Sequence, residues 1–107
     1  MPPTRISPTC KVLLSYDIRP EVVDGYYQYV LKEFVPELEV MGLYMFRVWH
    51  VAYGPYPVRQ LEFIAEDLED VHDILLSDRW SALENQFKTY TQRYARKLVR
   101  FRAGFQF

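Results

Sequence analysis

The sequence predicts an α+β domain with the ferredoxin-like order β-α-β-β-α-β, in which a four-stranded antiparallel sheet carries its helices on one face. Three observations predict this fold. A short alternating strand pattern precedes a long helical pattern. Two further strand patterns then meet at a proline-rich turn, Gly54-Pro55-Tyr56-Pro57. A second helical stretch leads into a last alternating strand.

The first strand and helix have clear boundaries. The run 11–18, KVLLSYDI, alternates in the manner of a half-buried strand. Pro20 at a first helical position opens a helix, and its apolar residues recur with a period near 3.6. We expect Pro36 to kink this helix near its end and Gly42 to terminate it.

The second half of the chain predicts two helical segments and a strand. Asp67 can cap a short helix, 68–76, and Ser77 can cap a second segment. Apolar residues of that second segment recur at steps of three and four: Trp80, Leu83, Phe87, Tyr90 and Tyr94. The last strand is expected at about 98–105, where apolar residues alternate with Arg100 and Arg102.

The two central strands, expected at 43–53 and 58–66, determine which side chains meet the helices. If Tyr53 lies opposite Val58, the apolar, helix-covered face contains Tyr44, Phe46, Val48, His50, Ala52, Leu61, Phe63 and Ala65. The opposite face then contains Met45, Arg47, Trp49, Val51, Gln60, Glu62, Ile64, Arg100 and Arg102. A one-residue slip would invert this assignment.

That second face predicts a homodimer. Its bulky apolar residues Met45, Trp49 and Ile64 would form an exposed patch that soluble monomers rarely tolerate. We therefore expect two sheets to meet face to face, with an interface formed by Met45, Arg47, Trp49, Glu62, Ile64, Arg100 and Arg102.

Length and composition limit the classes of function. At 107 residues the chain is one domain by size, with a flexible segment at 1–9 and the domain at 10–107. A single cysteine, Cys10, excludes an internal disulfide and fits a reducing compartment. The formal charge of −1 gives no general attraction to nucleic acid or to anionic membranes. We expect a cytoplasmic protein that has neither of these partners.

Two stretches resemble a known superfamily. The segment 74–83, ILLSDRWSAL, precedes Gln86-Phe87, a polar helix and KLVRF, and the opening YDIRPEVVDGYYQYV begins at Tyr16. Together they resemble the NIPSNAP-like and EthD-like members of the dimeric α/β-barrel superfamily over about 11–105. The resemblance implies a homodimer whose sheets pack into a barrel, with a pocket in each subunit between sheet and helices.

The resemblance leaves the activity open. The superfamily includes cofactor-free monooxygenases, isomerases, haem-dependent enzymes and many proteins of unknown role. Haem members usually bind iron through a histidine of the second helical region. Here His72 lies upstream of the Ser77–Trp80 motif rather than in the helix that contains Trp80, so we expect no cofactor.

His50 is the main candidate for catalysis. On the helix-facing side, its imidazole could act as a base or orient a substrate, helped by Tyr16. The alternative is a hydrogen-bonded core or rim histidine. No metal site is expected, because no His, Cys or carboxylate pair at helical spacing has a third ligand. Carboxylates near Asp67 are typical partners of a helix N-terminus.

Nine tyrosines and two tryptophans are the compositional oddity. They could pack the core, or they could line a flat pocket for an apolar or aromatic ligand. The residues we assign to such a pocket are Tyr26, Tyr27, Phe46, Phe63 and Trp80. Three hypotheses remain open: a small-molecule binder, a cofactor-free oxygenase or isomerase, and a structural or assembly module whose aromatics fill its own pocket.

Overall fold

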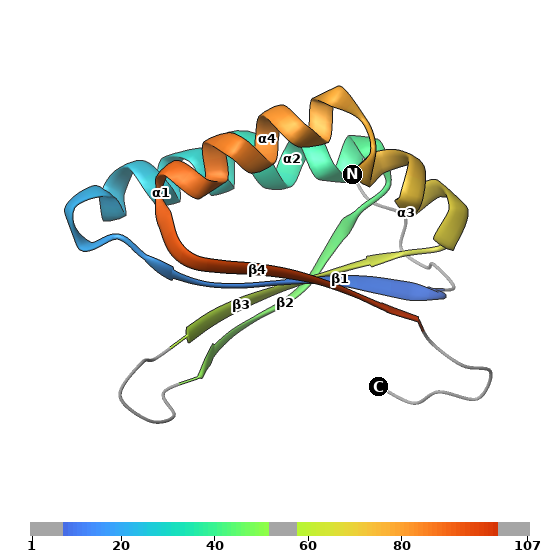
Figure 1. Cartoon of the computed structure of the whole chain (residues 1–107), viewed down its shortest axis with the longest axis horizontal. Helices are drawn as coiled ribbons and strands as arrows, with labels where there is room; N and C mark the ends of the chain where they lie inside the picture. Colours follow the sequence, from blue (N-terminus) through green and yellow to red (C-terminus); the bar gives the residue numbers. More distant parts are fainter. Residues whose placement is uncertain (1–7, 52–57, 101–107) are drawn as a thin grey trace.

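The computed structural model describes residues 8–51 and 58–100. A four-stranded antiparallel sheet carries all of the helices in these ranges on one face (Figure 1). The strands, in the spatial order β2-β3-β1-β4, are β1 (Cys10–Ile18), β2 (Tyr44–Val51), β3 (Val58–Ala65) and β4 (Thr91–Arg100). The predicted fold class is confirmed.

The first helical stretch runs in four sections over one face of the sheet. They are η1 (Pro20–Val22), α1 (Val23–Tyr29), the π-helical η2 (Val30–Phe34) and α2 (Val35–Met41). Pro36 lies in the first turn of α2, directly after the wide π turn. Because proline lacks an N–H and its ring crowds the carbonyl four residues earlier, a widened turn accommodates it. Gly42 then ends the helix with φ 109° and a left-handed cap, as predicted.

The second helical stretch consists of α3 (Leu68–Leu75) and α4 (Asp78–Thr89). Both predicted caps are present. The Asp67 carboxylate accepts a hydrogen bond from the Glu69 backbone N–H at 2.9 Å, and Ser77 Oγ accepts one from the Trp80 N–H at 3.1 Å. Each bond pairs a helix N–H that has no partner within the helix.

The fourth strand begins earlier than the sequence indicated. Helix α4 ends at Thr89, and Tyr94 lies in β4 rather than on the helix. Arg93 has φ 55°, and the register against β1 shifts at this point, so β4 contains a bulge. The bulge directs the Tyr94 ring onto Phe87 of α4, with ring centroids 5.7 Å apart. The predicted residues beyond Arg100, Arg102 among them, lie outside the described part of the chain.

A second bulge corrects the predicted faces of β2. Val58 pairs with Val51 rather than with Tyr53 as predicted, and this difference of two residues leaves the faces unchanged. The register also shifts between Met45 and Arg47, so one extra residue is present on β2. Met45 therefore lies opposite the buried Phe63 and packs against the core, so its predicted place on the open face is wrong. For the same reason Tyr44 lies on the open face rather than under the helices. The placement of Arg47 and Trp49 on the open face is confirmed, because they pair with Glu62 and Gln60.

The predicted face of Arg100 is also wrong. Arg100 pairs with Cys10, whose side chain is fully buried beneath the helices. Directly opposite residues of an antiparallel pair point to the same face, so Arg100 is on the helix side of the sheet. The open-face positions of β4 are instead Ala95, Lys97 and Val99, which pair with open-face residues of β1.

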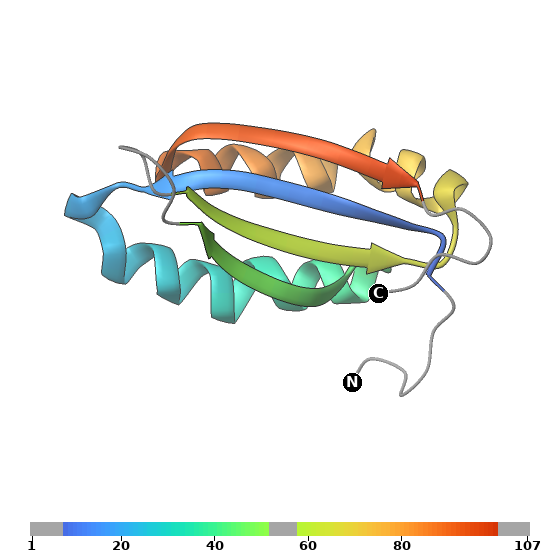
Figure 2. The same ribbon diagram turned by 90° about the horizontal axis from the view of Figure 1, so that it is seen from below.

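Aromatic side chains fill the space between sheet and helices. Phe34, Phe63, Trp80 and Phe87 are at most 1% exposed, and the Phe34 ring centroid lies 4.6–6.2 Å from the other three. The opposite face of the sheet has no helix over it among the described residues (Figure 2). In those residues, no helix has the length and apolar character to cross a membrane.

Candidate functional site

Three neighbouring strands bring His50, Arg59 and Tyr16 into one row. His50 pairs with Arg59 across β2 and β3, and Tyr16 pairs with Arg59 across β3 and β1. Residues paired in this way share a face, and adjacent strands lie about 4.8 Å apart. Tyr16 is fully buried under the helices, so the row lies on the helix side. The structure thus places both predicted catalytic residues on one face, with Arg59 between them.

Sequence reasoning missed Arg59. The signal was available, because Arg59 precedes the core residue Leu61 by two positions on the same strand and therefore shares its face. A guanidinium that alternates with apolar core positions is unusual, and it marks the point where the helix-covered face becomes polar.

Helix α1 adds two tyrosines, Tyr26 and Tyr27, to the row of His50, Arg59 and Tyr16. Arg59 Nη2 donates a hydrogen bond of 2.9 Å to the Tyr27 hydroxyl, and the Arg59 guanidinium carbon lies 5.6 Å from the Tyr27 ring centroid. The neighbouring Tyr26 shares a hydrogen bond with the Tyr16 hydroxyl. Pro20 starts the helical stretch two residues after β1, which places consecutive tyrosines over the end of the sheet.

The two buried tyrosines stay protonated at neutral pH. Burial raises the pKa of Tyr16 far above its usual value, and the nearby Tyr26 raises it further. Burial also raises the pKa of Tyr26, although its hydrogen bond with Tyr16 opposes the shift. Tyr16 can therefore donate a hydrogen bond but cannot supply a base, and its hydroxyl is already paired with Tyr26. Of the two predicted catalytic groups, only His50 is exposed to a ligand.

A pocket of about 290 Å³ opens at this end of the sheet. Its lining among the described residues is Asp17, Ile18, Pro20, His50, Arg59, Gln92 and Arg93. The Asp17 carboxylate pairs with the Arg93 side chain across β1 and β4. The pocket thus combines the His50 imidazole, the Arg59 guanidinium and the Asp17–Arg93 ion pair with the apolar side chains of Ile18 and Pro20.

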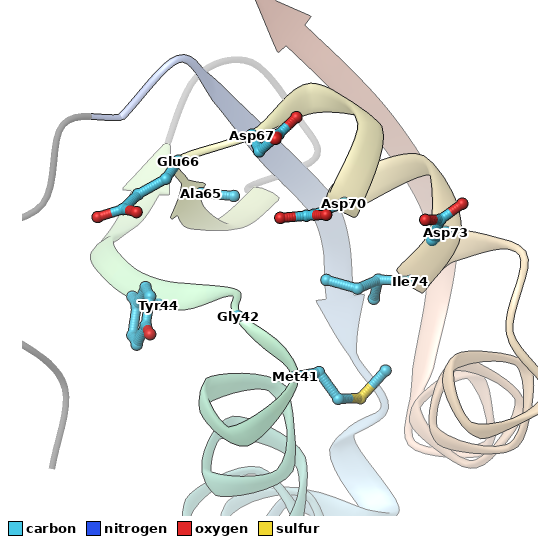
Figure 3. Close-up of a pocket in the computed structure, with 9 residues that line it drawn as sticks. All are labelled: Met41, Gly42, Tyr44, Ala65, Glu66, Asp67, Asp70, Asp73 and Ile74. Atoms are coloured by element: carbon cyan, nitrogen blue, oxygen red, sulfur yellow. The ribbon is translucent and has the colours of Figure 1, made fainter.

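A larger cavity, of about 470 Å³, lies at the other end of the domain (Figure 3). It has an apolar part that includes Met41 and Ile74. Its acidic residues come from the segment between β3 and α3 and from α3 itself: Glu66, Asp67, Asp70 and Asp73. In Figure 3 the Glu66 and Asp73 carboxylates lie on opposite sides of the opening. Asp67 is the helix cap, and carboxylates in a first helical turn are stabilised by the helix dipole. This cavity contains none of the predicted site residues.

The five predicted ligand-binding residues do not form one pocket. Tyr26, Phe63 and Trp80 belong to the packed core and are at most 1% exposed. Phe46 lies at the β2 bulge, where the Arg47 guanidinium approaches its ring to 4.9 Å. Only Tyr27, which is 39% exposed, reaches the Arg59 cluster from an accessible position.

The open face of the sheet holds a buried carboxylate. Glu62 is only 2% exposed, although no helix of the described ranges lies over this face. Its Oε1 accepts hydrogen bonds from Lys11 Nζ at 3.0 Å and Arg47 Nε at 3.2 Å. Its Oε2 accepts from Trp49 Nε1 and from Gln60 Nε2. These four donors cover the carboxylate and leave Trp49 itself 43% exposed.

Within residues 8–51 and 58–100, no group of three or more His, Cys, Asp or Glu side chains has an arrangement that could hold a metal ion. His72 is exposed on α3 and lines neither of the two pockets. Neither histidine is therefore part of a metal site in the described residues.

Known structures share this architecture. No family model matches the chain, and no curated protein matches it. An uncharacterized NIPSNAP-like domain protein from Burkholderia xenovorans has a TM-score of 0.60 at 17% identity, covering 92% of this chain and 89% of its own. An EthD family protein from Bacillus halodurans has a TM-score of 0.62 at 13% identity, with coverages of 87% and 99%. The chain has the NIPSNAP-like and EthD-like fold.

The same fold serves at least one enzyme. A hydroxynitrile lyase from Passiflora edulis has a TM-score of 0.67 at 7% identity, covering 94% of this chain and all of its own. Identities this low establish a shared fold, and one fold supports unrelated functions. The function of this chain must therefore be argued from its own site.

Proposed function

We propose that this protein is a homodimer that binds a small aromatic molecule in the pocket around Arg59 and His50. The pocket is formed where β1 ends and the first helical stretch begins. The observation that carries the proposal is the row formed by His50, Arg59 and Tyr16, which brings polar groups to the edge of an otherwise apolar face. Ligand sites typically combine an apolar wall with a few convergent polar groups.

The pocket volume supports a ligand of one or two rings. An engineered cavity of about 150 Å³ holds benzene, and drug-sized ligands occupy about 300–1,000 Å³. At about 290 Å³ the pocket lies between these cases. The aromatic core beneath the middle of the helices is packed, which favours a ligand at the end of the sheet over one at its centre.

The uncovered face of the sheet supports the homodimer. Residues on one face of a sheet bury their apolar groups against another layer, and here the helices supply only one such layer. The open face presents Leu13, Ile64 and Val99, all half-buried, beside the exposed Trp49. A second copy packed on this face would cover them and would bring the Glu62 clusters of two chains together.

Two measurements test the proposal. In an NMR titration with benzyl alcohol as the probe, we expect shifts to cluster at His50 and Arg59. Shifts clustered at Met41 and Ile74 instead, or no saturable shifts at millimolar probe, would reject the ligand site. Sedimentation equilibrium should show a dimer at micromolar concentration. A wild-type protein that sediments as a monomer would reject the dimer.

Matched variants locate the interface. Trp49→Glu should weaken the dimer, because it places a second negative charge beside Glu62 on the open face, which the partner chain would cover. Leu31→Glu is the control, since Leu31 is 68% exposed on the helical side. Equal dimer masses for both variants would exclude the open face as the interface.

A cofactor-free enzyme is the second candidate, favoured by the exposed position of His50 beside Arg59. In such an enzyme His50 would move a proton, and Arg59 would stabilise the negative charge that develops on the substrate. His50→Ala should then abolish turnover of an aromatic substrate without changing the unfolding midpoint. Unchanged turnover would remove His50 from the mechanism.

A further inference from the structure

Of the two arginines that line the pocket, Arg93 forms an ion pair and Arg59 forms none in the described residues. Four arginines in the described ranges form ion pairs: Arg47 with Glu62, Arg79 with Glu37, Arg93 with Asp17 and Arg96 with Glu84. Arg59 has no carboxylate within ion-pair distance among those residues, and its contacts there are to the Tyr27 hydroxyl and ring. The segments outside the described ranges contain no aspartate or glutamate, so no acidic side chain of the same chain is left to pair with it.

The charge of the pocket supports an anionic ligand. Two arginines and one aspartate line it, and the aspartate is already paired with Arg93. One positive charge, that of Arg59, therefore remains unneutralised at neutral pH. A half-buried cation attracts an anion more strongly than an exposed one, because the surrounding protein screens the two charges less than water does.

The geometry suits a carboxylate. One Nη2–H bond to Tyr27 holds the guanidinium in place, and the guanidinium has five N–H donors in a planar fork that matches two carboxylate oxygens. His50 lies directly across from Arg59 on the adjacent strand, with the Cα atoms of such pairs about 4.5–5.5 Å apart. Its imidazole can supply one further N–H donor to the same anion.

We propose that Arg59 is the anion subsite of this pocket and binds the carboxylate of a small aromatic acid, with His50 as a second donor. This inference rests on the proposed ligand site and adds the chemical class of the ligand. The ring of the acid would lie against Ile18 and Pro20, the apolar part of the pocket lining.

A matched pair of probes tests the charge. Benzoate and benzamide have nearly the same shape, but only benzoate is negatively charged at pH 7.5. By calorimetry or NMR at low salt, we expect the wild-type protein to bind benzoate about 10- to 100-fold more tightly than benzamide, the range of a charge-assisted hydrogen bond. Acetate, which lacks the ring, should bind more weakly than benzoate.

Variants assign the effect to Arg59. Arg59→Gln should remove the preference for benzoate over benzamide. Arg59→Lys should keep part of the preference, because it retains the charge but loses the planar fork. Arg79→Gln is the control, since Arg79 is an exposed arginine that does not line the pocket. If Arg59→Gln does not fold, the comparison of benzoate with benzamide on the wild-type protein still shows whether the pocket prefers an anion.

The outcomes separate this inference from the proposed function. Equal binding of benzoate and benzamide at His50 and Arg59 overturns the anion subsite and leaves the ligand site intact. Equal binding of acetate and benzoate overturns the aromatic part of the inference. Failure of every probe to bind at millimolar concentration overturns both proposals.

Discussion

Removing the Glu62 carboxylate tests whether the open face of the sheet is organised around a buried charge. In the wild type, this side chain is 3% exposed and pairs with Lys11, which is 12% exposed, and with Arg47, which is 43% exposed. Glu62→Ala would remove the carboxylate that pairs with the mostly buried Lys11 ammonium. Breaking a fully buried pair in this way costs about 3–5 kcal/mol.

The cost of removing the Glu62 carboxylate should be smaller than that of breaking a fully buried pair, because solvent screens part of this cluster. Arg47 is more than one-third exposed, so its contribution is screened and close to that of a surface pair, about 0–1 kcal/mol. We therefore expect Glu62→Ala to lower the free energy of unfolding by about 2–4 kcal/mol. Glu62→Gln keeps the shape and one acceptor oxygen but loses the charge, and should cost about half as much.

Urea unfolding at one fixed protein concentration measures these differences, because the midpoint of a dimer depends on concentration. Glu66→Ala is the control, since Glu66 is an exposed carboxylate just after the same strand, and we expect a change within about 0.5 kcal/mol. A Glu62→Ala protein as stable as the Glu66→Ala protein would refute the reasoning.

The same comparison should depend on pH. Burial raises the pKa of Glu62, but hydrogen bonds from Lys11, Arg47 and Trp49 outweigh it and hold the pKa below its usual value. A carboxyl with a lowered folded-state pKa stabilises the protein fully above its unfolded pKa, about 4.3. That stabilisation is lost as the pH falls through the lower folded value. The advantage of wild type over Glu62→Gln should therefore shrink below about pH 4.

Two further predictions concern the core and the helix end. Burial raises the pKa of Tyr16, Tyr29 and Tyr94, so these tyrosines should stay protonated above pH 10 until the protein unfolds, and stability should fall as the pH rises past the usual tyrosine value of about 10. Absorbance of tyrosinate measures this, and ionisation of all nine tyrosines before unfolding would contradict it. Gly42→Ala should cost about 1–2 kcal/mol in urea unfolding because of its φ of 109°, whereas Val40→Ala, at an exposed position two residues earlier, should be nearly neutral.

Local signals in the sequence were sufficient for the fold class and for the helix ends at Gly42, Asp67 and Ser77. Asp67 and Ser77 each place an acceptor where a helix N–H lacks a partner, and Gly42 permits the left-handed turn that ends the first helical stretch. The alternation of β1 directs Val12, Leu14 and Tyr16 to the core, as the pattern predicts. These features depend on a few neighbouring residues, so the chain specifies them locally.

The tertiary structure alone decided the two bulges. A bulge adds a residue to one strand relative to its partner, and nothing in the alternation of β2 shows that Met45 will face Phe63. Tyr94 follows Phe87 at a spacing compatible with a helix, and only pairing of β4 with β1 makes it part of a strand. The faces of Tyr44 and Met45, on the far side of the β2 bulge from the hairpin, could therefore not be read from the sequence.

The candidate site, too, could be predicted from the sequence only in part. The alternation of two strands placed His50 and Tyr16 on the helix-covered face, which is a property of the sequence pattern. Only the folded chain shows that Arg59 stands between them, that Tyr27 holds its guanidinium, and that Tyr16 is closed off by Tyr26. The physical reason is distance along the chain: these contacts join four separate elements, and side chains so far apart in sequence meet only when the sheet pairs and the first helix packs on it.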